Sequence, residues 1–153
     1  MLGTMLILRG KAGHYDGRDW PRGALYEQPA LHYAKKRGYV GRVLDIRGDP
    51  TGESSPQTGS ALTEFDKDPT ITALYGFSAG GYNVFHVLTR LKQEYRDRLE
   101  LVVVLGAPDR KEHWYTSKNF KANWKLVYRT DPPEAKGGHM GGPQALADER
   151  VLP

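Results

Sequence analysis

The chain has 153 residues, of which 39% are hydrophobic and none is cysteine. This length suits one domain over residues 1–153 with a core of its own. The absence of cysteine excludes disulfides, thiolate metal sites and a cysteine nucleophile. The net charge of +4 comes from basic residues scattered along the sequence, which favours a solvated surface over a nucleic-acid-binding patch.

Five apolar runs predict the strands of a sheet. They are residues 5–8, 40–46, 71–75, 101–105 and, with a weaker pattern, 125–128. Three successive valines at 102–104 are typical of a strand buried on both faces of a parallel sheet. No basic segment precedes the first run, so we expect a strand there and not a secretory leader. No run approaches the roughly 18 apolar residues of a membrane span, and we expect a soluble, cytoplasmic protein.

Helical spacing lies between these runs. A first helix is expected to begin near Pro29, because proline fits a first turn, and to end in the basic residues 35–37 before Gly38. A second helix is expected over residues 80–99, where apolar residues recur at i, i+4, i+7 and i+11. The apolar residues of this stripe are Val84, Leu88, Leu91 and Tyr95. Residues 49–60 are rich in turn formers and are expected to form a loop. Strands that alternate with helices predict an α/β fold.

The sequence GFSAG at residues 76–80 is a G-x-S-x-G motif between a predicted strand and a predicted helix. On a sharp strand-to-helix turn, small residues two positions to either side of the serine avoid collisions, and the serine hydroxyl is lifted clear of the sheet. The motif therefore predicts a nucleophile at Ser78. The alternative is a glycine-rich turn that binds a phosphate or only packs closely. A nucleotide site is disfavoured, because the P-loop lysine and the G-x-G-x-x-G pattern are both missing.

Together with two further segments, this motif resembles the α/β-hydrolase superfamily. Residues 43–48 (VLDIRG), followed by Gly52 and Ser54, are similar to the family's D-x-R-G-x-G-x-S segment, with two extra residues between the glycines. Residues 6–10 (LILRG) are similar to its strand ending in His-Gly, with Arg9 in place of the histidine. The resemblance implies a minimal three-layer α/β sandwich whose mostly parallel sheet has five strands in the order 2-1-3-4-5. It also implies a serine hydrolase for a carboxylic ester or thioester that uses neither cofactor nor metal.

A serine nucleophile needs a base, and the base needs an acid that orients it. The family order is serine, acid, histidine. His139 is flanked by glycines near the end of the chain, where the resemblance expects the base. The alternative is a histidine that only lies in a glycine loop. For the acid we favour Asp131, after the fifth run, with Asp109, after the fourth, as the alternative. Asp131 also precedes two prolines, which is typical of a structural turn.

The resemblance further implies an oxyanion hole made of two backbone N–H groups. One belongs to Ala79, and the other follows the first strand at Lys11 or Gly10. No insertion is long enough for a cap, so we expect an open site with the 49–60 loop and residues 114–115 as its rims.

The short connection between the expected acid and base, with arginine in the His-Gly position, motivates an alternative function. In that alternative the chain is a non-catalytic binding or interaction module with a hydrolase-like fold. For the enzyme we expect a small-molecule ester or thioester substrate and no nucleic acid. A homodimer in which a second copy covers an exposed sheet edge is left open.

Overall fold

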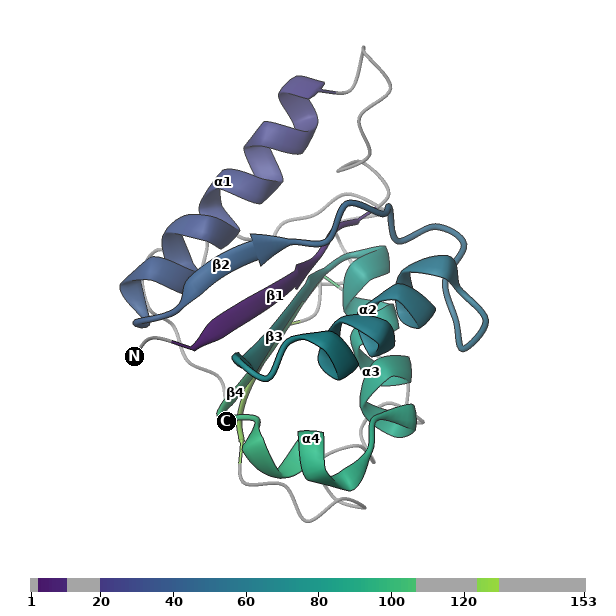
Figure 1. The fold of residues 1–153 in the computed structure, drawn as a ribbon. Coiled ribbons are helices and arrows are strands. Elements are labelled where there is room, and N and C mark those ends of the chain that lie inside the picture. Colours follow the sequence, from purple (N-terminus) through teal and green to yellow (C-terminus); the bar gives the residue numbers. More distant parts are fainter. Residues whose placement is uncertain (1–2, 11–19, 107–123, 130–153) are drawn as a thin grey trace.

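The computed structural model of the chain describes residues 3–10, 20–106 and 124–129, with only the backbone described at 20–26 and 128–129. In these residues five parallel strands form one sheet in the order β2-β1-β3-β4-β5 (Figure 1). The strands are β1 (Thr4–Leu8), β2 (Val40–Val43), β3 (Ile71–Phe77), β4 (Leu101–Leu105) and β5 (Lys125–Arg129). The predicted α/β class and the predicted strand order are both confirmed.

Helices cover both faces of the sheet. Helix α1 (Trp20–Lys36) lies on one face, and α2 (Pro56–Lys67), α3 (Ala79–Arg90) and α4 (Gln93–Arg98) lie on the other (Figure 1). Among the described residues no helix is long and apolar enough to cross a membrane.

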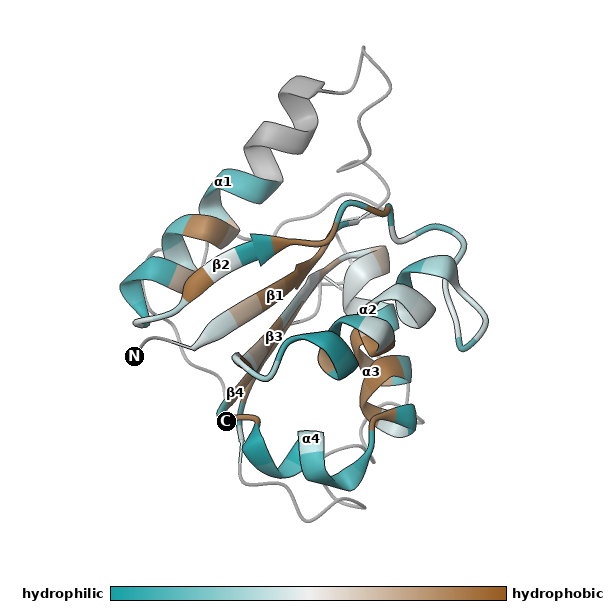
Figure 2. Cartoon of the chain, in the orientation of Figure 1, coloured by the Kyte–Doolittle hydropathy of each residue, from teal (hydrophilic) through white to brown (hydrophobic). Residues whose placement is uncertain are grey.

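Strand residues alternate between two hydrophobic cores, one on each face of the sheet. In β4, Val102 and Val104 face the core shared with α2 and α3, whereas Leu101, Val103 and Leu105 face the core shared with α1. All five are at most 2% exposed, as expected for a strand that is covered on both faces. Figure 2 shows the hydrophobic residues concentrated on the strands and on α3, while α4 is mostly hydrophilic.

The predicted start of the first helix is wrong. Helix α1 begins at Trp20, and Pro29 lies inside it. The proline that fits the first turn is Pro21, whereas Pro29 removes one N–H donor from the helix interior. The predicted end is confirmed, because α1 stops at Lys36 and Gly38 adopts a φ of 87°.

The predicted loop over residues 49–60 is wrong in its second half, where α2 begins. Ser55 caps this helix by accepting a hydrogen bond from the N–H of Gln57 at 3.2 Å, and Pro56 occupies the first helical position. Both residue types are typical of a helix start. The Ser-Pro pair is therefore a helix signal inside the segment expected to be a loop.

The single helix predicted over residues 80–99 is two helices, α3 and α4. The chain becomes extended at Leu91, whose ψ is 138°. Val84, Leu88 and Leu91 are all buried in the core beside α2, and Tyr95 packs against the same core from α4. The predicted apolar stripe is therefore present, although the backbone that carries it is interrupted.

Candidate active site

Ser78 lies on the sharp turn between β3 and α3, with φ 56° and ψ −120°. It is the one non-glycine residue with positive φ in the part of the chain that the structure describes. These angles match the first central position of a type II′ turn, which glycine dominates. A side chain held in such a conformation costs about 1–3 kcal/mol.

Gly80, the motif glycine that follows the serine, has no room for a Cβ, because the backbone at the end of β1 passes close to it. A Cβ added at Gly80 would lie 2.3 Å from the carbonyl oxygen of Leu8, where β1 ends. A Cβ added at Gly48 would lie 2.8 Å from the Cβ of Ala79 and 2.7 Å from the carbonyl oxygen of Arg9. The three sequence segments on which the family resemblance depends therefore meet at the turn that holds the serine.

The backbone around Ser78 is anchored, but its side chain does not cap the helix that follows. Its N–H donates to the carbonyl oxygen of Leu105 in β4 at 2.8 Å, and its carbonyl oxygen accepts from the N–H of Tyr82 at 3.2 Å. A serine in front of a helix ordinarily accepts a hydrogen bond from the first turn, and Ser78 makes no such bond. Ala79 is the first helical residue, so its N–H has no acceptor within the helix and lies at the positive end of the helix dipole.

Gly10 contacts the turn from the end of β1. A Cβ added at Gly10 would lie 3.2 Å from the Cβ of Ser78 and 3.0 Å from the carbonyl oxygen of Phe77. One of the two expected positions for the second oxyanion donor therefore lies beside the serine. Lys11, the other position, lies outside the described residues.

Arg9, directly after β1, forms a buried ion pair. Its side chain is 7% exposed and contacts Glu27 of α1 through Nε and Nη2, while its Nη1 donates to Asp45 Oδ1 at 2.9 Å. Asp45 is almost fully exposed, so its contribution to stability is small. Arg9 thus connects the end of β1 to α1 and to the segment after β2. The sequence interpretation missed Glu27, because no local signal relates it to Arg9.

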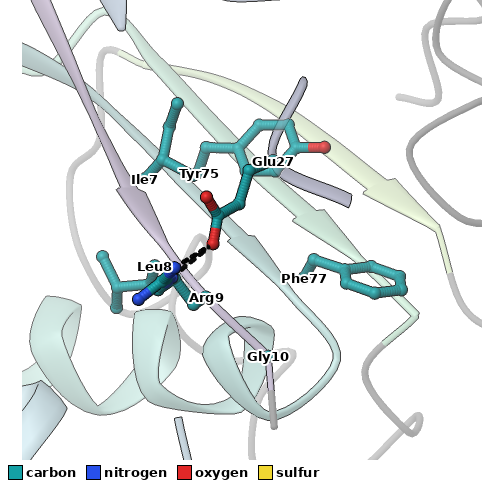
Figure 3. A pocket seen from close by; sticks show the side chains of 7 residues that line it. All are labelled: Ile7, Leu8, Arg9, Gly10, Glu27, Tyr75 and Phe77. Carbon is teal, nitrogen blue, oxygen red and sulfur yellow. Dashed lines mark hydrogen bonds and ion pairs between the residues drawn. The ribbon is translucent and has the colours of Figure 1, made fainter. Parts of the chain in front are cut away.

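A small pocket lies beside this ion pair at the carboxyl end of β1 and β3. Its lining includes Arg9, Gly10, Glu27, Tyr75 and Phe77 (Figure 3). The hydroxyl of Tyr75 is buried and has no hydrogen-bond partner among the described residues. Burial, reinforced by Tyr33, raises the pKa of the Tyr75 hydroxyl far above its ordinary value. The pocket therefore combines an ion pair, aromatic rings and an unpaired hydroxyl close to the end of β3.

A buried polar pair on the other face of the sheet was also missed. Gln57 in α2 and Asn83 in α3 are both 0% exposed, and Asn83 Nδ2 donates to Gln57 Oε1 at 2.8 Å. The sequence contains a weak signal for Asn83, which lies directly before Val84 on the apolar side of α3. Gln57 is in the segment expected to be a loop, and nothing local identifies its partners.

The structure thus brings together Ser78, Ala79 and Gly10, and it does not reach the remaining candidates. The expected base His139, the favoured acid Asp131 and the alternative acid Asp109 all lie outside the described residues, as do the expected rim residues 114–115. Their roles stay predictions. Within residues 3–10, 20–106 and 124–129 no group of three metal-ligating side chains occurs.

Comparison with known proteins adds no family. No protein-family model matches the sequence, and no curated protein sequence matches it either. The structure shows an α/β fold with a five-stranded parallel sheet and no more specific family.

Proposed function

We propose that the chain is a serine hydrolase in which Ser78 attacks the carbonyl carbon of a carboxylic ester or thioester. The backbone of Ser78 carries this proposal. If the turn served only to connect β3 to α3, glycine would hold it without strain. A serine that keeps a strained conformation and leaves its helix uncapped favours a role for the hydroxyl itself. Strain of this kind is concentrated at active sites.

In the proposed reaction His139 takes the proton of the Ser78 hydroxyl as a bond forms between Oγ and the substrate carbonyl carbon. Asp131, or in its place Asp109, orients the imidazole. The tetrahedral intermediate collapses as the alcohol or thiol leaves with the proton from the imidazolium. Water, activated by the same histidine, then releases the acid from the acyl-enzyme.

The charge that develops on the carbonyl oxygen would be stabilised by backbone donors at the start of α3. The N–H of Ala79 is suited to this by its place at the helix terminus. The second donor would come from Gly10 or Lys11, after β1. Losing one oxyanion donor typically slows acyl transfer by about 10²–10³-fold, so the position of the β1 end matters as much as that of the serine.

A fluorophosphonate probe tests the proposal without knowledge of the substrate. We expect it to label the wild-type chain, to fail on Ser78→Ala, and to label His139→Ala at a strongly reduced rate. Comparing Asp131→Asn with Asp109→Asn identifies the acid, because only the true acid should slow labelling. Labelling should also decline below pH about 6–7 as the histidine protonates. If the folded wild type is not labelled, the enzyme proposal fails and the binding-module alternative is favoured.

We propose a small ester or thioester as substrate and a cytoplasmic location.

In the described sheet β2 is an edge strand, and Val40 on it is 55% exposed. A second copy of the chain could cover this edge, and light scattering of the purified protein would show whether a homodimer forms.

A further inference from the structure

We propose that Gln57 is a positioning residue, whose side-chain amide holds the end of β1 in register with the serine turn. This inference rests on the proposed function, because the group that Gln57 positions is the second oxyanion donor. The hydrogen bonds that the structure describes for the Gln57 side chain lead to Arg9, Ile46 and Asn83, and none of them leads to Ser78. The effect of Gln57 would pass through the backbone that it binds.

The amide nitrogen of Gln57 binds the ends of two neighbouring strands. Gln57 Nε2 donates to the carbonyl oxygen of Arg9, directly after β1, at 2.9 Å, and to that of Ile46, after β2, at 2.8 Å. An amide nitrogen has two hydrogens, and both are used. An apolar side chain of similar size could fill the space, but it would leave two carbonyl oxygens without this donor.

The amide oxygen of Gln57 connects the same point to α3. It accepts from Asn83 Nδ2 at 2.8 Å, and Asn83 lies in the helix that begins directly after Ser78. Asn83 Nδ2 also lies 2.9 Å from the carbonyl oxygen of Gly48, and its Oδ1 accepts from the N–H of Gly52 at 2.9 Å. One pair of side chains therefore holds the segments after β1 and β2 against α3.

The bond to Arg9 has a direct consequence for Gly10. The carbonyl of Arg9 and the N–H of Gly10 belong to one planar peptide group. Holding the oxygen therefore fixes the direction of the Gly10 N–H. Gly10 also lies against Ser78. With Gly10 as the second oxyanion donor, the place of its N–H relative to the serine depends on the peptide that Gln57 binds.

Gln57→Glu is the sharpest test, because it keeps the shape of the side chain and replaces the double donor with carboxyl oxygens. We expect the rate constant of fluorophosphonate labelling at Ser78 to fall about 10–100-fold. Leu99→Ala is the matched control: Leu99 is buried in the core at the amino-terminal edge of the sheet, so its loss should lower stability and leave labelling within about twofold of the wild type. Both variants are measured at a temperature where circular dichroism shows them folded.

A wild-type labelling rate in folded Gln57→Glu would overturn the proposal, as would an equal loss of rate in Leu99→Ala. If Gln57→Glu does not fold, Asn83→Asp replaces it. This variant keeps the acceptor for Gly52 and removes the donor to Gln57, and it should lower the labelling rate about tenfold. Amide hydrogen exchange at Gly10 separates this inference from the enzyme proposal. Faster exchange in the Gln57 variant, together with an unlabelled wild type, would mean that Gln57 holds the Arg9–Gly10 peptide but that this peptide serves no hydrolase. Unchanged exchange would mean that Gln57 does not hold this peptide, which would refute the proposal.

Discussion

Replacing Ser78 with glycine should stabilise the protein while abolishing its reactivity. The backbone conformation at Ser78, φ 56° and ψ −120°, costs a side-chain-bearing residue about 1–3 kcal/mol. Glycine adopts it freely but loses about 0.4–1 kcal/mol through the greater freedom of the unfolded chain. The net gain in the free energy of unfolding is then about 1 kcal/mol for Ser78→Gly. Ser78→Ala keeps the Cβ and its strain, and should stay close to the wild type.

Urea unfolding followed by circular dichroism measures this difference, provided that the three proteins share one m-value. In thermal unfolding, about 1 kcal/mol corresponds to a Tm about 2–4 °C higher for a chain of this size. Ser60, inside α2, gives the matched control. There Ser60→Gly should be less stable than Ser60→Ala by about 1 kcal/mol, because the backbone is helical. If Ser78→Gly were no more stable than Ser78→Ala, the turn would not be strained, and the main support for a nucleophilic serine would be lost.

Three further substitutions test the surroundings of the turn by urea unfolding. Gly80→Ala should lower the free energy of unfolding by about 3 kcal/mol or more, because its Cβ would lie 2.3 Å from a backbone oxygen. Gly59→Ala in α2 meets open space and should raise the free energy of unfolding by about 0.5–1 kcal/mol. Equal effects of the two variants would refute the close approach at Gly80. Arg9→Met should lower the free energy of unfolding by about 3–5 kcal/mol, because it leaves the Glu27 carboxylate unpaired. A double variant with Glu27→Met should recover most of this loss. If the losses of the two single variants simply added, Arg9 and Glu27 would not be energetically coupled. Burial raises the pKa of Tyr75 above its ordinary value of 10.0, so the folded protein keeps this proton after the unfolded chain has lost it. The resulting stability is complete below pH about 10 and falls as the pH rises further. Tyr75→Phe should therefore flatten the alkaline loss of stability by about 1.4 kcal/mol per pH unit, and an unchanged slope would mean that Tyr75 ionises normally.

Local patterns predicted the sheet better than the helices. Continuous apolar runs bounded by turn formers are a short-range signal, and each of the five corresponds to an observed strand. The helix boundaries depended on choosing among competing signals. The sequence offers Pro29 as a helix start, although Pro21 is the proline in the first turn. It also offers residues 49–60 as a loop, although the Ser55-Pro56 pair begins α2. A proline or serine fits either role, and only the surrounding fold selects one.

The candidate site likewise has a part that the local sequence predicts and a part that it does not predict. Ser78 and its neighbouring glycines were predictable, because the steric demands of a strand-to-helix turn act within five residues of one another. The partners of Arg9 and Gln57 were not predictable, because these polar groups meet across long separations: Arg9 pairs with Glu27, 18 residues away, and Gln57 binds the carbonyl of Arg9, 48 residues away. Nothing in a single sequence relates such positions.

The side chain and the backbone of Arg9 have different partners. An arginine where the resemblance expects a histidine motivates the alternative of a non-catalytic module. In the structure the Arg9 side chain faces Glu27, while its backbone carbonyl is held by Gln57. The backbone at this position is the part that would serve an oxyanion hole, and a change of side chain leaves it in place. The substitution therefore does not argue against catalysis, and the labelling of Ser78 becomes the observation that separates the enzyme from the binding module.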